Sequence, residues 1–152
     1  MVLGFGNVLL GDDGAGVRLV ELLRTDPSLG GCTFVDGGTI SFNLLSYIDS
    51  TARMLVIDAA ELHQPPGAHA LFEDDAMDAF LKSTRRRTVH EVGLIDLLDM
   101  ARMEDCLPER RALLCIQPAQ IGWSEALSPI VSRALHDAAD QARRLIWRWT
   151  QP

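Results

Sequence analysis

The sequence has little cysteine. Only Cys32, Cys106 and Cys115 occur among its 152 residues, and no Cys-x-x-Cys pair is present. An odd number of unevenly spaced cysteines argues against a disulfide framework and against a zinc knuckle. We therefore expect free, buried thiols in a protein of the reducing cytoplasm.

Long hydrophobic runs are also absent, although hydrophobic residues make up 47% of the chain. No run approaches the roughly 20 residues that a membrane-spanning helix needs. No charged-then-apolar leader comes before the first glycine-rich segment. We expect a cytoplasmic protein without membrane contact, folded as a single domain over residues 1–152.

Basic residues are outnumbered, with 14 Lys and Arg against 21 Asp and Glu and a formal net charge of −7. This balance argues against a nucleic-acid partner. The one basic run, Arg85-Arg86-Arg87, is interpreted as a solvated loop, with contact to an acidic partner as the alternative. The acidic surface and the lack of an obvious apolar stripe favour a monomer.

The chain does contain strand patterns that alternate with helix patterns. Short apolar runs predict strands near residues 2–5, 32–35, 54–57, 68–72 and 112–116. Apolar residues at helical spacing predict helices near residues 17–26, 41–48, 94–101 and 128–149, the last beginning with Ser128 as N-cap and Pro129. This alternation indicates an α/β sandwich with a mainly parallel sheet, in which ligands bind at the carboxyl ends of strands.

The most informative segment has five glycines between residues 4 and 16. Such a loop resembles a dinucleotide-binding turn, where backbone amides meet a pyrophosphate at a helix N-terminus. Here, however, Asp12 and Asp13 lie in the turn, and two carboxylates would repel a phosphate. A cation is the better electrostatic match.

Three chemically active side chains follow predicted strands. Asp13 comes after the first strand, Asp58 ends the third, and His90 opens the helix after the edge strand. Two carboxylates and an imidazole suit a borderline divalent ion and leave coordination positions open. Structural roles are the alternatives: Asp12 or Asp13 as a cap of the first helix, Asp58 as an acceptor for loop amides, and His90 as a capping or packing residue.

Other catalytic patterns fail. The segment His90-Glu91-Val92-Gly93-Leu94 begins like a zincin helix but lacks the second histidine. No Gly-x-Ser-x-Gly elbow is present, so nucleophilic catalysis has little support. The remaining histidines are expected at the surface: His63, His69 and His136.

Taken in order, several motifs resemble those of the hydrogenase maturation endopeptidases, which process the large subunit of nickel-iron hydrogenases. The resemblance covers essentially the whole chain, and its combination of motifs is specific. The motifs are Gly4-Phe5-Gly6-Asn7, Leu10-Gly11-Asp12-Asp13-Gly14-Ala15-Gly16, Asp36-Gly37-Gly38-Thr39, Ile57-Asp58-Ala59, His90-Glu91-Val92-Gly93-Leu94 and Ile116-Gln117-Pro118.

The resemblance implies a three-layer α/β/α sandwich of the phosphorylase/hydrolase-like kind. Its five-stranded sheet is mostly parallel and mixed, with one antiparallel edge strand. The implied catalytic and metal-binding residues of this aspartyl-type endopeptidase are Asp13, Asp58 and His90, with Asp12 as the alternative to Asp13. Asp36, Gly37, Gly38 and Thr39 would shape the cleft and bind the substrate tail, or form only a tight turn.

The implied reaction removes a C-terminal extension from the large-subunit precursor after nickel has been inserted. The nickel belongs to the substrate, so no tightly held metal of the protease itself is expected. The alternative is a non-catalytic metallochaperone or assembly factor on the same scaffold. A nucleotide-binding protein is a third interpretation, which the paired aspartates oppose.

Overall fold

The structure, a computed structural model, describes residues 1–38, 44–84 and 89–151, apart from the side chains of residues 84 and 89–92. Its sheet has the order β2-β1-β3-β5-β4. The strands are β1 (Val2–Phe5), β2 (Phe34–Gly38), β3 (Arg53–Ala59), β4 (His69–Glu73) and β5 (Arg110–Ile116). All neighbouring pairs are parallel except β4 with β5, which confirms the mixed sheet with an antiparallel edge.

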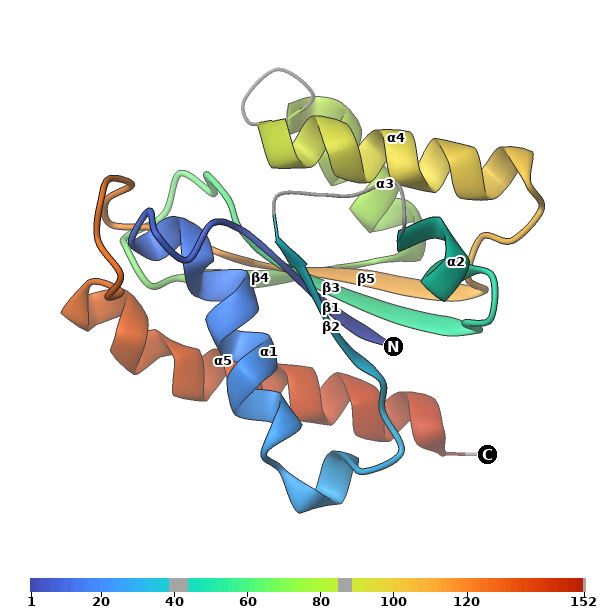
Figure 1. The fold of residues 1–152 in the computed structure, drawn as a ribbon, viewed down its shortest axis with the longest axis horizontal. Coiled ribbons are helices and arrows are strands. Elements are labelled where there is room, and N and C mark those ends of the chain that lie inside the picture. The colour runs from blue at the N-terminus through green and yellow to red at the C-terminus, as the bar shows by residue number, and fades with distance from the viewer. Residues whose placement is uncertain (39–43, 85–88, 152) are drawn as a thin grey trace.

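Helices cover both faces of this sheet (Figure 1). One face is covered by α1 (Ala15–Arg24) and α5 (Pro129–Thr150), and the other by α2 (Leu45–Ile48), α3 (Asp74–Thr84) and α4 (Val89–Met103). Side chains of β3 alternate between the two cores, with Leu55 and Ile57 on the α1/α5 side and Met54 and Val56 on the other. The three-layer α/β/α architecture is confirmed.

The closing helix begins as its sequence predicts. Pro129 is the first residue of α5, and the Ser128 hydroxyl accepts a hydrogen bond from the Val131 amide at 3.4 Å. Proline loses no helical hydrogen bond at this position, and the serine satisfies one amide that the helix leaves unbonded.

Two elements differ from the sequence prediction. Helix α3 was not predicted, although Asp74 and Asp75 in its first turn and the spacing of Met77, Phe80 and Leu81 are typical of a helix. Strand β2 continues through Gly38, so Asp36, Gly37 and Gly38, which were expected after the strand, belong to it. Pairing with β1 extends β2, because Gly4 aligns with Asp36 and Phe5 with Gly38.

The helix predicted near residues 41–48 is described only from residue 44, and the predicted substrate residue Thr39 and the basic run Arg85-Arg86-Arg87 lie outside the described residues. In the described ranges, no helix has both the length and the apolar character that crossing a bilayer requires.

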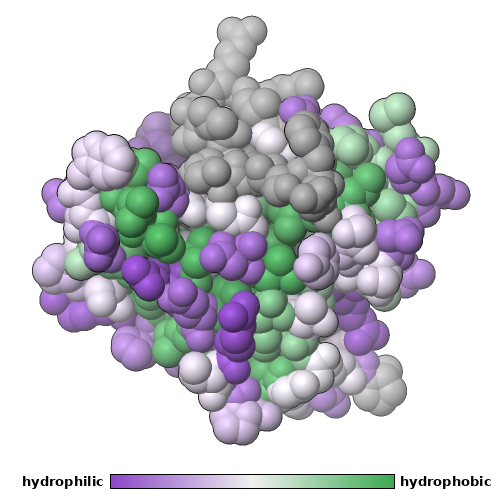
Figure 2. Space-filling view, viewed as in Figure 1, coloured by the Kyte–Doolittle hydropathy of each residue, from purple (hydrophilic) through white to green (hydrophobic). Residues whose placement is uncertain are grey.

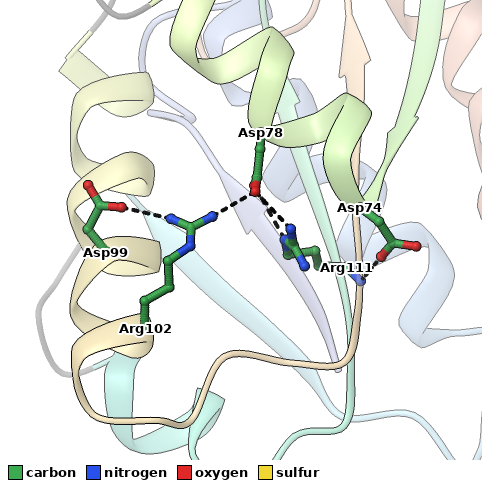
Figure 3. Close-up of polar contacts among 5 residues, drawn as sticks. All are labelled: Asp74, Asp78, Asp99, Arg102 and Arg111. Carbon is green, nitrogen blue, oxygen red and sulfur yellow. Dashed lines mark hydrogen bonds and ion pairs between the residues drawn. The ribbon is translucent and has the colours of Figure 1, made fainter.

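An ionic cluster joins α3 to α4 and β5 (Figure 3). Asp78 accepts hydrogen bonds at 2.8 Å from Arg102 and at 2.8 Å from Arg111, while Asp74 accepts from the Arg111 amide at 3.0 Å. Burial alone would raise the pKa of Asp78, but its hydrogen bonds and ion pairs with Arg111 and Arg102 outweigh burial and lower that pKa. The cluster therefore fixes α3 and α4 against the end of the sheet where β5 begins.

Candidate functional site

The glycine-rich segment folds β1 back tightly onto the start of α1. Gly6 has φ 124°, and a side chain there would overlap the Asp13 carbonyl oxygen. A side chain at Gly16 would overlap the carbonyl oxygens of Phe5 and Ile57, so α1 packs directly on the backbone of β1 and β3. Only glycine permits these two close approaches. Between them, the 3-10 helix Asp12–Gly14 places Asp12 and Asp13 after the carboxyl end of β1.

Asp12 links two loops. Its carboxylate is 0% exposed and accepts from the amides of Ala119 at 2.9 Å, Gln120 at 3.1 Å and Ser128 at 2.6 Å. The Ser128 hydroxyl donates a further hydrogen bond at 2.8 Å. Both carboxylate oxygens are thus bonded within the protein, which is a structural role and leaves Asp13 as the better candidate for a ligand.

Asp13 faces the start of its own loop. The residue is 8% exposed, and its Oδ2 accepts a hydrogen bond from the Asn7 amide at 2.8 Å. The N-cap of α1 is Gly14, without a side-chain cap, so the expectation that Asp12 or Asp13 caps this helix was wrong. The Asp12 carboxylate instead accepts hydrogen bonds from residues between 119 and 128, and the Asp13 carboxylate accepts one from Asn7.

Asp58 is the sixth of the seven residues of β3 and is 3% exposed. It follows Met54 and Val56 at intervals of two, so it lies on the face covered by α3 and α4. Its neighbour in register on β5 is Cys115, whose partner on β4 is Ala70. The carboxylate is therefore placed at the carboxyl end of the central strand, beneath the helical layer that contains α4.

His90 belongs to the first turn of α4, and its side chain lies outside the described residues. Strand β5 is parallel to β3, so it begins at the end of the sheet opposite to the carboxyl ends of the parallel strands. Because α4 leads into β5, α4 runs from the carboxyl ends of the strands toward that opposite end. The start of α4 thus lies on the same face as Asp58 and at the same edge. Among the side chains that the structure describes, which do not include that of His90, no three His, Cys, Asp or Glu residues form a possible metal site.

The predicted substrate segment lies at the end of the edge strand β2. Asp36 accepts a hydrogen bond from the Gly38 amide at 2.8 Å, and the Gly38 carbonyl accepts one from Gly6 at 2.8 Å. Gly38 has φ 52°, and Gly37 packs against the Phe5 ring. Thr39 lies outside the described residues. The segment is thereby held next to the glycine-rich loop.

Of the other histidines and the cysteines, Cys115 lies beside Asp58 on the neighbouring strand β5. His63 and His136 are exposed, as expected, and His69 is half-buried on β4. The three cysteines are free thiols, but only Cys115 is fully buried, so the expectation that all three are buried was wrong for Cys32 and Cys106.

Sequence reasoning missed the role of residues 117–128. The amides of Ala119, Gln120 and Ser128 bind Asp12. The backbone of this segment also pairs with the glycine-rich loop, because the Gly11 amide donates a hydrogen bond to the Ser124 carbonyl at 2.7 Å. The available signal was a second carboxylate next to Asp13 in the turn, but the partners of Asp12 lie more than a hundred positions away. Asp13 and Asp58 thus both lie at the carboxyl ends of the strands. Carboxylate oxygens are groups that can bind a divalent cation.

Comparisons with known proteins give this arrangement its family. A family model described as hydrogenase maturation protease matches residues 17–144. The hydrogenase expression/formation protein HoxM of Cupriavidus necator is 30% identical over 151 residues, which cover 98% of this chain and 74% of HoxM. HupD of Rhizobium leguminosarum is 31% identical over 151 residues, with coverage of 98% and 74%.

Solved structures agree with the sequence relatives. The hydrogenase maturating endopeptidase HybD from Escherichia coli is similar with a TM-score of 0.88 and 27% identity, over 98% of this chain and 92% of HybD. The hydrogenase 2 maturation peptidase from Thaumarchaeota archaeon SCGC_AB-539-E09 has a TM-score of 0.72 and 31% identity, over 95% of both chains. This chain therefore belongs to the hydrogenase maturation protease family, a family of peptide-bond hydrolases.

Proposed function

We propose that this protein is the endopeptidase that removes the C-terminal extension from the nickel-loaded large-subunit precursor of a nickel-iron hydrogenase. One observation supports this most strongly. In a chain of the maturation protease family, Asp13, Asp58 and the start of α4 with His90 lie at the same edge of the sheet. The nickel ion is cargo of the precursor, and these three residues are its proposed ligands on the protease.

The chemistry of the ligands explains how the protease would select its substrate. Carboxylate and imidazole groups bind a borderline divalent ion, and three such ligands leave positions for groups of the precursor. A precursor without nickel lacks this interaction and binds less tightly, so completed nickel insertion controls cleavage. Binding at Asp13 and Asp58 would also orient the peptide bond that follows the metal-bearing segment.

The end of β2 is the proposed contact for the substrate tail. Asp36, Gly37 and Gly38 form an edge strand beside the glycine-rich loop, and Thr39 follows them in the chain. An extended peptide can add to such an edge through backbone hydrogen bonds. The Gly38 amide already donates to Asp36, so this proposal places the tail along the remaining backbone groups of the segment.

The same proposal places a monomeric protease in the cytoplasm, with neither nucleic acid nor a membrane as partner. The three free thiols suit a reducing compartment. The net charge of −7 opposes binding to nucleic acid and to acidic lipid surfaces.

The decisive experiment follows the C-terminal mass of the precursor, purified with and without nickel, after mixing with the protease. We expect loss of the extension only from the nickel-loaded form. Asp13→Asn, Asp58→Asn and His90→Ala should each slow cleavage at least about 100-fold, because even outer-shell partners of metal ligands are worth 10–100-fold.

Matched controls remove the same chemistry elsewhere. His136→Ala changes an exposed histidine of α5 and Asp99→Asn an exposed aspartate of α4, and both should leave the rate unchanged. Normal processing by Asp13→Asn and His90→Ala would show that the assigned ligands are wrong. A stable complex without any loss of mass from the precursor would instead identify a non-catalytic assembly factor.

A further inference from the structure

Two loops at the carboxyl edge of the sheet expose large hydrophobic side chains. Leu9 is 46% exposed, Ile121 is 56% exposed and Trp123 is 86% exposed. We call these three residues the loop patch. The two loops lie side by side at the upper left of Figure 1, and Figure 2 shows hydrophobic residues at the surface in the same area, between hydrophilic ones.

The backbone beneath the loop patch is held firmly. The Ser124 amide donates to the Leu9 carbonyl at 3.0 Å, and the Gly11 amide donates to the Ser124 carbonyl at 2.7 Å. The buried Asp12 carboxylate fastens the same two loops from inside. Trp123 is therefore exposed on a loop whose backbone is held by hydrogen bonds. An exposed apolar surface of this kind is typical of a protein–protein contact.

The loop patch is directly connected to the candidate ligand Asp13. The Leu9 amide donates to Asn7 Oδ1 at 3.0 Å, and the Asn7 amide donates to Asp13 Oδ2 at 2.8 Å. Asn7 is thus hydrogen-bonded to both Leu9 and Asp13 and links the two residues. A folded protein that delivers its C-terminal segment to Asp13 must pass over the surface immediately around it.

We propose that the loop patch is the docking surface for the folded body of the hydrogenase large-subunit precursor, an inference that rests on the proposed function. The precursor is the protein that must approach Asp13, and the patch is continuous with that position. Tryptophan dominates the binding energy of many protein interfaces because it buries a large, rigid surface. Trp123 is accordingly the expected centre of the contact, with Leu9 and Ile121 beside it.

The test compares Trp123→Ala and the double variant Leu9→Ala/Ile121→Ala with Trp147→Ala. Trp147 is the matched control. It is 66% exposed but lies near the C-terminal end of α5, whereas the loop patch adjoins the N-terminal end of that helix. Steady-state cleavage of nickel-loaded precursor gives KM and kcat, and biolayer interferometry gives Kd for nickel-free precursor. Circular dichroism verifies that every variant is folded.

For Trp123→Ala and the double variant, KM and Kd should rise at least about tenfold while kcat stays within about twofold of the wild type. Trp147→Ala should change none of them. Unchanged KM and Kd in both patch variants, or equal changes in Trp147→Ala, would overturn the proposal. So would a wild-type dimer that Trp123→Ala dissociates without altering Kd, since the patch would then bind a second copy.

The two arms separate this proposal from the proposed function. A wild-type protein that cleaves no precursor refutes the protease assignment, whereas the Kd comparison with nickel-free precursor still decides the docking surface. Conversely, normal cleavage with unaltered KM in the patch variants refutes the docking surface alone.

Discussion

At the scale of single residues, two neighbouring aspartates have different environments. Asp12 is 0% exposed and accepts four hydrogen bonds from residues 119–128, so its carboxylate stabilises the folded loops. Asp13 is 8% exposed and bonds to Asn7 within its own loop. One position of difference in the 3-10 helix therefore separates a structural carboxylate from a candidate ligand.

We predict that Asp12→Ala lowers the free energy of unfolding by about 3 kcal/mol, because the buried amide and hydroxyl of Ser128 and the part-buried amides of Ala119 and Gln120 lose their acceptor. Asp13→Asn should cost no more than about 1 kcal/mol, since the amide oxygen still accepts from Asn7. Urea denaturation followed by tryptophan fluorescence measures both. Equal stability of Asp12→Ala and the wild type would refute the structural role of Asp12.

At the scale of elements, the position of α4 depends on an ionic cluster that is only partly exposed. Asp78 of α3 bonds to Arg102 of α4 and to Arg111 of β5 (Figure 3). The side chains of Asp78 and Arg111 are 18% and 12% exposed, so their pairing is less screened by water than a surface ion pair. Arg102 is in the last turn of α4 and His90 in its first, so this cluster anchors the end of the helix opposite to His90.

We predict that Asp78→Asn lowers the free energy of unfolding at neutral pH by about 1–2 kcal/mol, through loss of charge-assisted hydrogen bonds to two arginines. The folded-state pKa of Asp78 lies below its ordinary value, so its contribution is complete above roughly pH 4, the usual Asp pKa. It is lost as the pH falls from there through the lowered folded-state pKa.

Urea denaturation at several pH values between 7 and 2 checks this prediction. The difference between wild type and Asp78→Asn should shrink only below about pH 4. Asp99→Asn is the control, since Asp99 is 54% exposed and, among the described residues, pairs with Arg102, and it should cost less than about 0.5 kcal/mol. A constant difference over the whole pH range would contradict an ionised Asp78 as the source.

At the scale of the whole molecule, one edge of the sheet collects the site. The turn after β1, the end of β2 and the end of β3 all meet there, and the start of α4 lies over the same edge. This follows from parallel pairing of β1, β2 and β3, which points their carboxyl ends the same way. In the proposed function, the nickel ion that these groups bind arrives with the precursor.

We therefore predict that EDTA leaves the thermal midpoint of the isolated protein unchanged within about 1 °C. A resident ion present at 100 times its Kd would add about 2.7 kcal/mol, or roughly 5 to 10 °C for a chain of this size. Differential scanning calorimetry before and after chelation measures the shift. A fall of several degrees would show that the protease holds a metal of its own.

The sequence predicted the sheet well where the pattern was local. The continuous apolar run of β3 and the Ser128-Pro129 start of α5 were both located correctly, because burial on two faces and helix capping leave signals within a few residues. Helix α3 was missed although its spacing was typical. The role of Asp12 could not have been read locally, since Ala119, Gln120 and Ser128 become its neighbours only on folding.

The sequence by itself determined the fold class, the family and the identity of the candidate ligands, because glycine spacing, apolar periodicity and strand-end carboxylates are properties of short segments. The tertiary structure gave the Asp12 carboxylate its hydrogen-bond partners and brought the loops of Leu9, Ile121 and Trp123 side by side. Both outcomes depend on hydrogen bonds between segments more than a hundred residues apart, and such contacts exist only once the sheet has brought the two loops to one edge.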